Sequence, residues 1–271
     1  MPPRRDGAAA CPTSSPGRAS AGKERHLKRR RPPRPRLEWA YFFDLDGTLI
    51  DFAATPSAVR VSEDLRLLLE RLHRATGGAV ALMSGRPISE IDRLFPQIPL
   101  PAAGHHGLER RNARGRIRRP DSARPAPARR LERVRRRMAD ALQGKAGLLL
   151  EDKGLSLALH YRRAPRLGAY AHRLARSLLP LVGRQFCIQR GKYVVEMRPA
   201  GRDKGKGILE FMKETPFRGR TAVFVGDDAT DEFGFRTVNR LGGYSIKVGR
   251  GASAAHWRLS DVRAVRDWLA S

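Results

Sequence analysis

Long hydrophobic runs are missing from this chain of 271 residues. No apolar stretch approaches the roughly 20 residues of a membrane-spanning helix, and no apolar segment follows the charged N-terminus as in a secretory signal. Cysteine is scarce: Cys11 and Cys187 lie far apart and form no CxxC pair, so we expect neither a zinc site nor a framework of disulfides. These absences predict a cytoplasmic protein, and no pattern indicates an oligomeric state.

Acidic residues are also few, because 27 Asp and Glu stand against 54 Lys and Arg, which gives a formal charge of +27. Residues 1–38 contribute a surplus of eight positive charges and residues 110–137 a surplus of eleven. This surplus raises the hypothesis of a nucleic-acid-associated protein. No helix-turn-helix, zinc or aromatic RNA-binding pattern accompanies it, so the alternative is a set of solvated Arg-rich faces with weak, non-specific polyanion binding.

Large apolar residues are nearly absent from residues 1–38, which mix Pro, Arg, Ser, Gly and Ala. Such a segment cannot bury enough apolar surface to offset the entropy lost on ordering. We therefore predict a disordered basic tail over 1–38, with ordered structure from Trp39 onward.

The segments 39–106 and 196–271 have the pattern of an α/β domain. Short apolar runs predict buried strands of a parallel sheet, at 40–45, 79–83, 221–226 and 244–248. Amphipathic segments between them predict helices, the first of which Ser62 can cap. Alternation of strands and helices favours right-handed crossover connections.

The segment 107–195 has a different pattern and predicts a smaller α+β domain inserted into the first. Leu155, Leu157 and Leu159 alternate with small or polar residues, as in a sheet with one wet face. Residues 129–142 and 167–182 are amphipathic and predict helices. Residues 185–198 predict a hairpin that turns at Arg190-Gly191.

Four polar clusters follow predicted strands or begin a predicted helix. Open α/β sheets bind their ligands at the carboxyl ends of the strands. The clusters are Asp44-Leu45-Asp46-Gly47-Thr48, Ser84-Gly85-Arg86, Lys204 and Gly226-Asp227-Asp228.

The carboxylates of these clusters predict a cation site. Asp44 ends a buried strand, where an uncompensated carboxylate is costly, so it needs a cation or a covalent role. Gly47 permits a sharp turn that can aim Asp44 and Asp46 at one place. With Asp227 and Asp228 added, the carboxylates repel one another unless a hard divalent cation binds, and Mg²⁺ fits oxygen ligands.

Ser84 and Lys204 are then suited to hold the oxygens of a phosphoryl group. Each motif alone has an ordinary interpretation: the Asp-x-Asp can be a turn or a Ca²⁺ loop, Ser84 a turn residue and Lys204 a surface residue. All four in this order, each at a strand end or a helix start, predict phosphoryl transfer.

The motifs resemble those of the haloacid dehalogenase (HAD) superfamily of phosphohydrolases and, within it, the bacterial trehalose-6-phosphate phosphatases. The resemblance covers about residues 39–270. It rests on these stretches: Phe43–Leu49, Gly104–Arg111, Ala158–Arg162, Val195–Gly201, Lys204-Gly205, Gly226–Glu232, Val238–Gly243 and Trp257–Leu259. It implies a Rossmann-like three-layer core with a parallel sheet, an inserted α+β cap domain, and Mg²⁺-dependent hydrolysis of trehalose 6-phosphate in trehalose biosynthesis.

The resemblance also implies roles for the core residues. Asp44 is expected to be the nucleophile that forms an aspartyl-phosphate, and Asp46 the acid that protonates the leaving sugar and then activates water. The expected Mg²⁺ ligands are Asp44, the Asp46 backbone carbonyl and Asp227, supported by Asp228 and Asp231. The residues expected to position the phosphoryl group or brace the site are Thr48, Ser84, Gly85, Arg86 and Lys204.

In the inserted domain, Glu151, Lys153 and Glu196 match positions that contact the distal glucose in similar enzymes, and closure of this cap would exclude water. Without the resemblance, these charges indicate an ordinary solvated surface.

Three alternatives stay open. The phosphoryl-transfer residues do not identify the leaving group, so a phosphatase for another sugar phosphate fits the same motifs. A phosphotransferase or phosphomutase is a further alternative, but Asp46 together with an open path for water favours hydrolysis. A nucleic-acid-associated basic protein is the alternative from a different class.

Overall fold

The computed structural model of the protein describes residues 31–53, 58–96, 98–119 and 125–271. Contacts divide these residues into two compact units. The smaller unit consists of the described residues within Pro120–Gly201. The larger unit consists of the described residues up to Arg119 and of Arg202–Ser271. No helix in these ranges combines the length and the apolar composition that a membrane crossing requires.

The larger unit is built on an eight-stranded sheet. Its strands are β1 (Trp39–Phe43), β2 (Val80–Met83), β3 (Ala102–Gly104), β4 (Glu109–Arg111), β5 (Ile117–Arg118), β10 (Thr221–Gly226), β11 (Tyr244–Val248) and β12 (Trp257–Leu259). Their order is β12-β11-β10-β1-β2-β3-β4-β5. Neighbours from β12 to β3 are parallel, whereas β4 and β5 are antiparallel.

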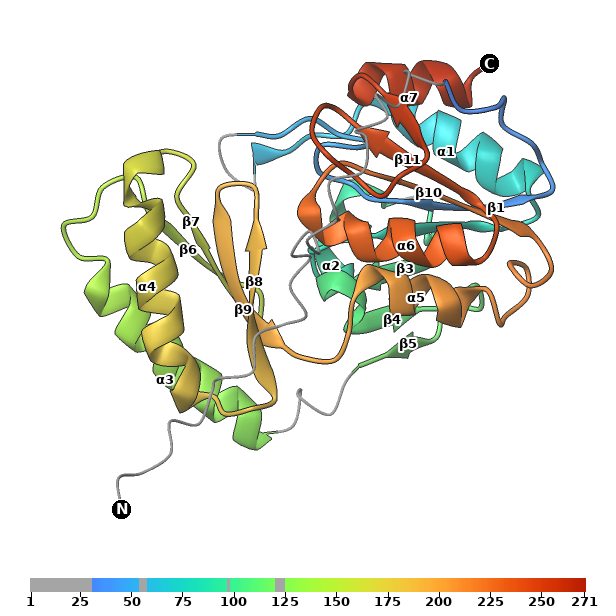
Figure 1. The fold of residues 1–271 in the computed structure, drawn as a ribbon. Helices are drawn as coiled ribbons and strands as arrows, with labels where there is room; N and C mark the ends of the chain where they lie inside the picture. Colours follow the sequence, from blue (N-terminus) through green and yellow to red (C-terminus); the bar gives the residue numbers. More distant parts are fainter. Residues whose placement is uncertain (1–30, 54–57, 97, 120–124) are drawn as a thin grey trace, which may run out of the picture. The chain divides into compact units, whose positions relative to one another are not determined.

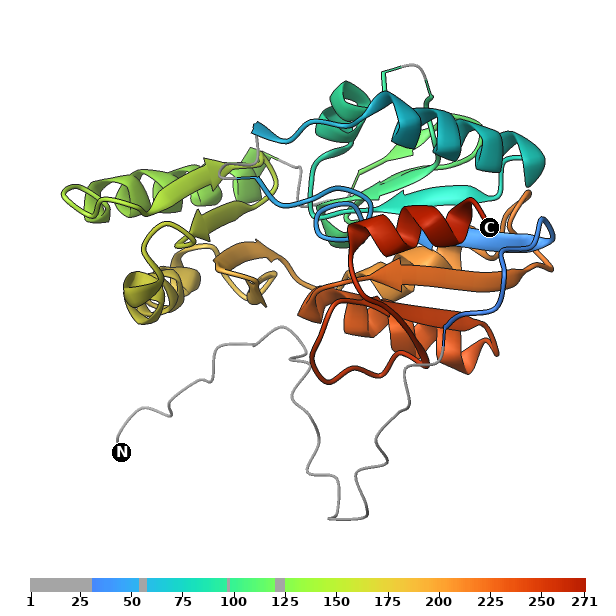
Figure 2. The same ribbon diagram turned by 90° about the horizontal axis from the view of Figure 1, so that it is seen from above.

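Helices cover both faces of this sheet. Successive side chains of a strand point to opposite sides, so a strand that is apolar throughout needs a helix layer on each side. The helices are α1 (Glu63–Ala75), α2 (Ile88–Leu94), α5 (Lys204–Phe211), α6 (Glu232–Arg240) and α7 (Val262–Leu269). Tyr41 and Phe43 of β1 pack with side chains of α1, α2 and α7. Ala40 and Phe42 pack with side chains of α5 and α6. Figure 1 shows the three layers, and Figure 2 looks onto the face that carries α1 (teal) and α7 (red).

The helix starts follow the polar residues that precede them. Ser62 accepts a hydrogen bond from the Leu65 amide at 3.4 Å at the start of α1, as the sequence predicted. Asp261 accepts one from the Ala264 amide at 2.8 Å at the start of α7. Both side chains satisfy amides that have no partner within the helix. The α/β core, its buried parallel strands and their connecting helices are therefore confirmed.

The smaller unit pairs two helices with one antiparallel sheet. Its elements are α3 (Pro125–Ala141), β6 (Leu149–Asp152), β7 (Leu157–His160), α4 (Gly168–Leu178), β8 (Phe186–Gly191) and β9 (Val194–Pro199), and the strand order is β6-β7-β9-β8. Leu157 and Leu159 pack with Val134 of α3 and Ala171 of α4 on one face. The other face carries Ala158 and, just before the strand, Ser156, and both are 0% exposed, so the face that the alternation predicted to be wet is buried here.

The bounds of the two units differ from the predicted ones at both junctions. The prediction began the insertion at 107, but β4 and β5 extend the sheet of the larger unit. It ended the insertion at 195, but β9 pairs with β7 and β8 up to Pro199. The hairpin turn also lies at Lys192-Tyr193 instead of Arg190-Gly191. Strand pairing sets each bound of the inserted domain. Because the paired strands are distant in sequence, a local pattern does not locate these bounds.

The segment just before Trp39 is not the disordered tail that the sequence predicted. The Trp268 indole donates a hydrogen bond to the Pro33 carbonyl at 2.8 Å. The Tyr41 hydroxyl donates to the Arg36 carbonyl and accepts from the Arg36 amide, both at 2.8 Å. These contacts attach residues 33–36 to the larger unit. The remainder of the predicted tail, 1–30, lies outside the described residues.

The Arg-rich segment 110–137 is divided between the two units. Arg110 and Arg111 on β4 are 7% and 6% exposed, and they pair with Glu214 and Asp92, respectively. The arginines of α3 belong to the smaller unit. Part of the basic surplus is therefore used in packing.

The one aromatic residue of β10, Phe224, should contribute strongly to the stability of the larger unit. Phe224 is fully buried, with its ring 5.3 Å from that of Phe235 and its edge against Gly234. We expect Phe224→Ala to lower the free energy of unfolding by about 3–5 kcal/mol in urea titrations. Leu67 on α1 is 39% exposed, so Leu67→Ala is the matched control. It should change the free energy of unfolding by less than about 1 kcal/mol.

Candidate active site

Parallel pairing of β1 and β10 brings two of the predicted acidic clusters together. Phe43 lies beside Val225 in the sheet, and the Asp44 amide donates to the Val225 carbonyl at 2.9 Å. Asp44 and Asp227 therefore leave the same edge of the sheet. One carboxylate oxygen from each of Asp44, Asp227 and Asp231 lies within 4.8 Å of the other two.

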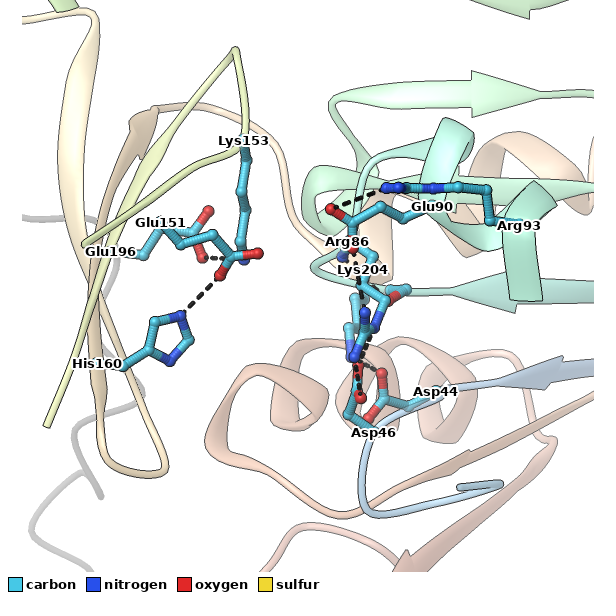
Figure 3. Close-up of polar contacts among 11 residues, drawn as sticks. Asp44, Asp46, Arg86, Glu90, Arg93, Glu151, Lys153, His160, Glu196 and Lys204 are labelled. Carbon is cyan, nitrogen blue, oxygen red and sulfur yellow. Dashed lines mark hydrogen bonds and ion pairs between the residues drawn. The ribbon is translucent and has the colours of Figure 1, made fainter. Parts of the chain in front are cut away.

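Lys204, the first residue of α5, joins two of these carboxylates. Its Nζ donates to Asp44 Oδ1 at 2.7 Å and to Asp231 Oδ1 at 2.6 Å. Lys204 is 2% exposed, and Asp203 caps its helix by accepting from the Lys206 amide. Figure 3 shows the Lys204 side chain meeting Asp44. A buried ammonium between two buried carboxylates balances charge that would otherwise be costly.

Asp231 shapes the loop that follows β10. Its second oxygen, Oδ2, accepts from the amides of Asp227 and Asp228, both at 2.9 Å. Gly226 is required here, because a Cβ at this position would overlap the Asp231 side chain. Since both Asp231 oxygens already accept hydrogen bonds, this residue positions Asp227 and Asp228 and is less suited than Asp227 to bind a metal ion.

The loop after Asp44 is closed by hydrogen bonds to one carbonyl. The amides of Thr48, Leu49 and Ile50 all donate to the Leu45 carbonyl, at 3.0 to 3.2 Å. Gly47 has φ +88, and a Cβ there would overlap the Asp227 carboxylate. Glycine therefore permits both the left-handed turn and the close approach of Asp227.

Asp46 is held by Arg86, which follows β2. Arg86 Nε and Nη2 donate to the two Asp46 carboxylate oxygens, each at 2.8 Å. Its remaining nitrogen, Nη1, donates to Glu90 on α2 at 3.1 Å. Figure 3 shows this Glu90–Arg86–Asp46 chain. A two-point contact with a planar guanidinium fixes the direction of the carboxylate as well as its position.

Ser84 and Gly85 lie against the loop of His105 and His106, which no sequence pattern had indicated as part of the site. The amides of His105 and His106 donate to the carbonyls of Arg86 and Ser84, at 3.0 and 2.8 Å. Both histidines have left-handed backbone conformations, with φ 48 and φ 56. The ring of His106 fills the space where Gly85 would carry a Cβ. Strained non-glycine residues of this kind are retained where the surrounding structure fixes them.

A second buried lysine was also missed. Lys247 of β11 is 7% exposed, and its Nζ donates to the Asp227 carbonyl. The signal in the sequence was a single lysine inside a strand that otherwise reads as buried. Ser245 and Val248 around it gave no reason to connect that lysine with Asp227.

The cluster has the electrostatic character of a cation site. Burial, together with the neighbouring charge of Asp231, raises the pKa of Asp44 well above its usual range. Burial and the charges of Asp231 and Asp228 raise the pKa of Asp227 to about 7. Asp227 Oδ1 and Thr48 Oγ1 are buried with no hydrogen-bond partner among the described residues. A divalent cation would relieve the repulsion and satisfy the Asp227 oxygen.

The three predicted sugar-binding residues lie in the smaller unit. Lys153 Nζ is 3.5 Å from Glu196 Oε2, and these side chains are 9% and 5% exposed. Glu151 accepts from His160 at 2.7 Å, and Ser156 donates to Glu196 at 2.5 Å. His160 and Ser156 were not predicted, because one histidine and one serine in a strand pattern give no functional signal.

The structure thus places the predicted site residues in two groups. The larger unit brings together Asp44, Asp46, Thr48, Ser84, Gly85, Arg86, Lys204, Asp227, Asp228 and Asp231. The smaller unit brings together Glu151, Lys153 and Glu196.

The raised pKa of Asp227 predicts a pH dependence of stability. Between its usual value of 3.8 and about 7 the folded protein binds more protons than the unfolded chain, so the free energy of unfolding falls as the pH rises through this range. In EDTA, we expect wild type to lose stability from about pH 4 to about pH 7 relative to Asp227→Asn.

Added Mg²⁺ should restore that loss at the higher pH in wild type and not in Asp227→Asn, as measured by thermal unfolding. Equal pH profiles for the two proteins would contradict the electrostatic assignment.

Relatives of the chain were found by sequence and by structure. It is 43% identical over 235 residues to a probable trehalose-phosphate phosphatase of Sinorhizobium fredii, covering 86% of this chain and 87% of the relative. It is 42% identical over 240 residues to the trehalose-6-phosphate phosphatase of Escherichia coli, covering 88% and 87%.

Solved structures agree on the fold. The C-terminal domain of Candida albicans trehalose-6-phosphate phosphatase aligns with a TM-score of 0.74 at 22% identity, covering 84% of this chain and 90% of that one. A haloacid dehalogenase-like hydrolase from Bacteroides thetaiotaomicron aligns with a TM-score of 0.59 at 15% identity, covering 86% and 98%. A model of the trehalose-phosphatase family matches residues 42–263. The chain therefore belongs to the trehalose-phosphatase family, on the HAD fold.

Proposed function

We propose that this protein hydrolyses trehalose 6-phosphate to trehalose and phosphate, with Mg²⁺ as cofactor. The observation that carries the proposal is the Lys204 ammonium buried between Asp44 and Asp231, beside an Asp227 oxygen that has no partner among the described residues. Membership of the trehalose-phosphatase family, and the names of the relatives above, support the choice of substrate.

Asp44 is proposed as the nucleophile. One of its carboxylate oxygens forms a bond to phosphorus while the bond from phosphorus to the sugar oxygen breaks, and Asp46 donates a proton to that leaving oxygen. Asp46 then accepts a proton from water as the water oxygen attacks the aspartyl-phosphate. That step releases inorganic phosphate and returns both carboxyl groups to their starting states. Arg86 donates to both Asp46 oxygens, so one of them must leave Arg86 before it can carry the proton for the leaving oxygen.

Asp44, Asp227 and the Asp46 backbone carbonyl are the proposed ligands of Mg²⁺. Carboxylate and carbonyl oxygens suit a hard cation, and the closely spaced, partly unsatisfied carboxylates support the assignment. Bound Mg²⁺ would neutralise charge on the phosphoryl oxygens. Asp228 and Asp231 support the loop that carries Asp227.

Thr48, Ser84 and Lys204 are proposed to hold the phosphoryl oxygens, with Gly85 leaving room for the His106 ring beside Ser84. Lys204 already balances Asp44 in the buried site and would also stabilise the negative charge of the transferring group. Glu151, Lys153 and Glu196 are proposed to bind sugar hydroxyls, which both donate and accept hydrogen bonds. Membership of the HAD fold alone does not select the sugar, so these cap residues decide the substrate.

A panel of sugar phosphates tests the proposed substrate. With Mg²⁺ present, trehalose 6-phosphate should give the highest kcat/KM, by at least about tenfold over glucose 6-phosphate, because a second glucose unit adds hydrogen bonds in the transition state. Phosphate release should fall to background in EDTA. No release from trehalose 6-phosphate, or faster release from a monosaccharide phosphate, would refute the proposal.

The nucleophile is tested by Asp44→Asn. An amide cannot form the aspartyl-phosphate, so turnover should fall by at least about 10³-fold. The thermal midpoint should stay close to that of wild type, because Lys204 keeps its contact with Asp231 and an amide oxygen at position 44 can still accept from it. Asp267→Asn, on an exposed position of α7, is the control and should retain full activity. Substantial activity of Asp44→Asn would remove the assignment.

A further inference from the structure

The polar face of the smaller sheet carries an ordered set of contacts centred on β7. Side chains of a strand alternate between faces, so Ala158 and His160 lie on one face together with Ser156, the residue just before the strand. Strand β7 is central, with β6 on one side and β9 on the other. Two of the proposed sugar-binding residues, Glu151 and Glu196, lie on these flanking strands.

His160 holds the carboxylate on β6. Its Nε2 lies 2.7 Å from Glu151 Oε2, and the two side chains are 23% and 17% exposed. Burial raises the pKa of Glu151, but the His160 hydrogen bond and the Lys153 charge outweigh it and the pKa is lowered. An ionised carboxylate only accepts hydrogen bonds, so the Nε2 nitrogen of His160 carries the proton.

Ser156 holds the carboxylate on β9. Its hydroxyl donates to Glu196 Oε1 at 2.5 Å, and Ser156 is fully buried. The other oxygen of Glu196 faces Lys153 Nζ at 3.5 Å. The two oxygens of Glu196 therefore have different partners, which fixes the rotation of its carboxylate group.

Ala158 separates the two carboxylates. It is the direct cross-strand neighbour of both Glu151 and Glu196. Side chains at such positions have Cβ atoms about 4.5–5.5 Å apart. Ala158 is fully buried, so a larger side chain at this position would have to displace its neighbours.

We infer that His160 and Ser156 are positioning residues that hold Glu151 and Glu196 for sugar hydroxyls. The inference rests on the proposed function and deepens it, because it names what orients the sugar-binding carboxylates. A carboxylate already fixed in direction loses less conformational freedom when a ligand binds.

Steady-state kinetics on two substrates test the inference. For trehalose 6-phosphate, His160→Ala and Ser156→Ala should each raise KM about tenfold with little change in kcat, which is the effect of losing one hydrogen bond to a charged group. For p-nitrophenyl phosphate, which has no sugar, kcat/KM should change less than about twofold. His160→Gln and Ser156→Thr keep a donor and should recover most of the affinity.

Matched controls come from the helix side of the same unit. His172 and Ser177 lie on α4, where Ser177 donates to the Leu174 carbonyl. His172→Ala and Ser177→Ala should leave both KM values within about twofold of wild type. Ala158→Leu, which would crowd the cross-strand neighbours Glu151 and Glu196, should raise KM for trehalose 6-phosphate at least as much as His160→Ala.

A double-mutant cycle separates positioning from direct contact. If His160 acts through Glu151, then His160→Ala combined with Glu151→Ala should be no worse than Glu151→Ala alone. Additive losses, or an unchanged KM in both His160→Ala and Ser156→Ala, would overturn the inference. Failure of wild type to hydrolyse trehalose 6-phosphate would overturn the proposed function instead, and calorimetry of trehalose binding to wild type and variants would then decide the inference by itself.

Discussion

The larger unit depends on the ammonium of Lys204, buried between Asp44 and Asp231. Lys204 begins α5, Asp44 follows β1, and Asp231 lies before α6, so one side chain connects three elements that are distant in sequence. Breaking a buried pair leaves an uncompensated charge and is strongly destabilising, whereas the intact pair adds little stability. The proposed phosphoryl transfer would explain the arrangement better than stability does, because it needs the same ammonium.

Close approach of the acidic groups is possible because glycine occupies the crowded positions. At Gly47 and Gly226 a Cβ would overlap Asp227 and Asp231, respectively. The resulting repulsion between carboxylates is not relieved by Lys204 alone, since the pKa of Asp227 is still raised to about 7. A folded site with an excess of negative charge has a preference for divalent cations before any cation binds.

The two units divide the proposed work. The larger unit gathers the groups that act on phosphorus, and these are shared by enzymes with unrelated leaving groups. The smaller unit gathers Glu151, Lys153 and Glu196, each contacted by another polar side chain of the same sheet. An antiparallel sheet with one helix-covered face leaves its other face for polar side chains, and its pleat sets their spacing.

The sequence by itself predicted the main strands and helices of both units and indicated phosphoryl transfer. Asp44, Asp227 and Lys204 could be found because each follows a buried strand or begins a helix, and parallel strands end at a common edge. The sequence could not determine which strands pair with one another, so residues 107–119 were assigned to the inserted domain although β4 and β5 belong to the larger sheet. It also placed the start of the ordered chain at Trp39, after the residues that contact the larger unit. Tertiary structure alone decided that Arg111 is buried, that Lys247 reaches the Asp227 carbonyl, and that His160 contacts Glu151. The reason is that a local sequence pattern reflects residues that are neighbours along the chain. These contacts instead join residues that strand pairing brings together from distant parts of the sequence.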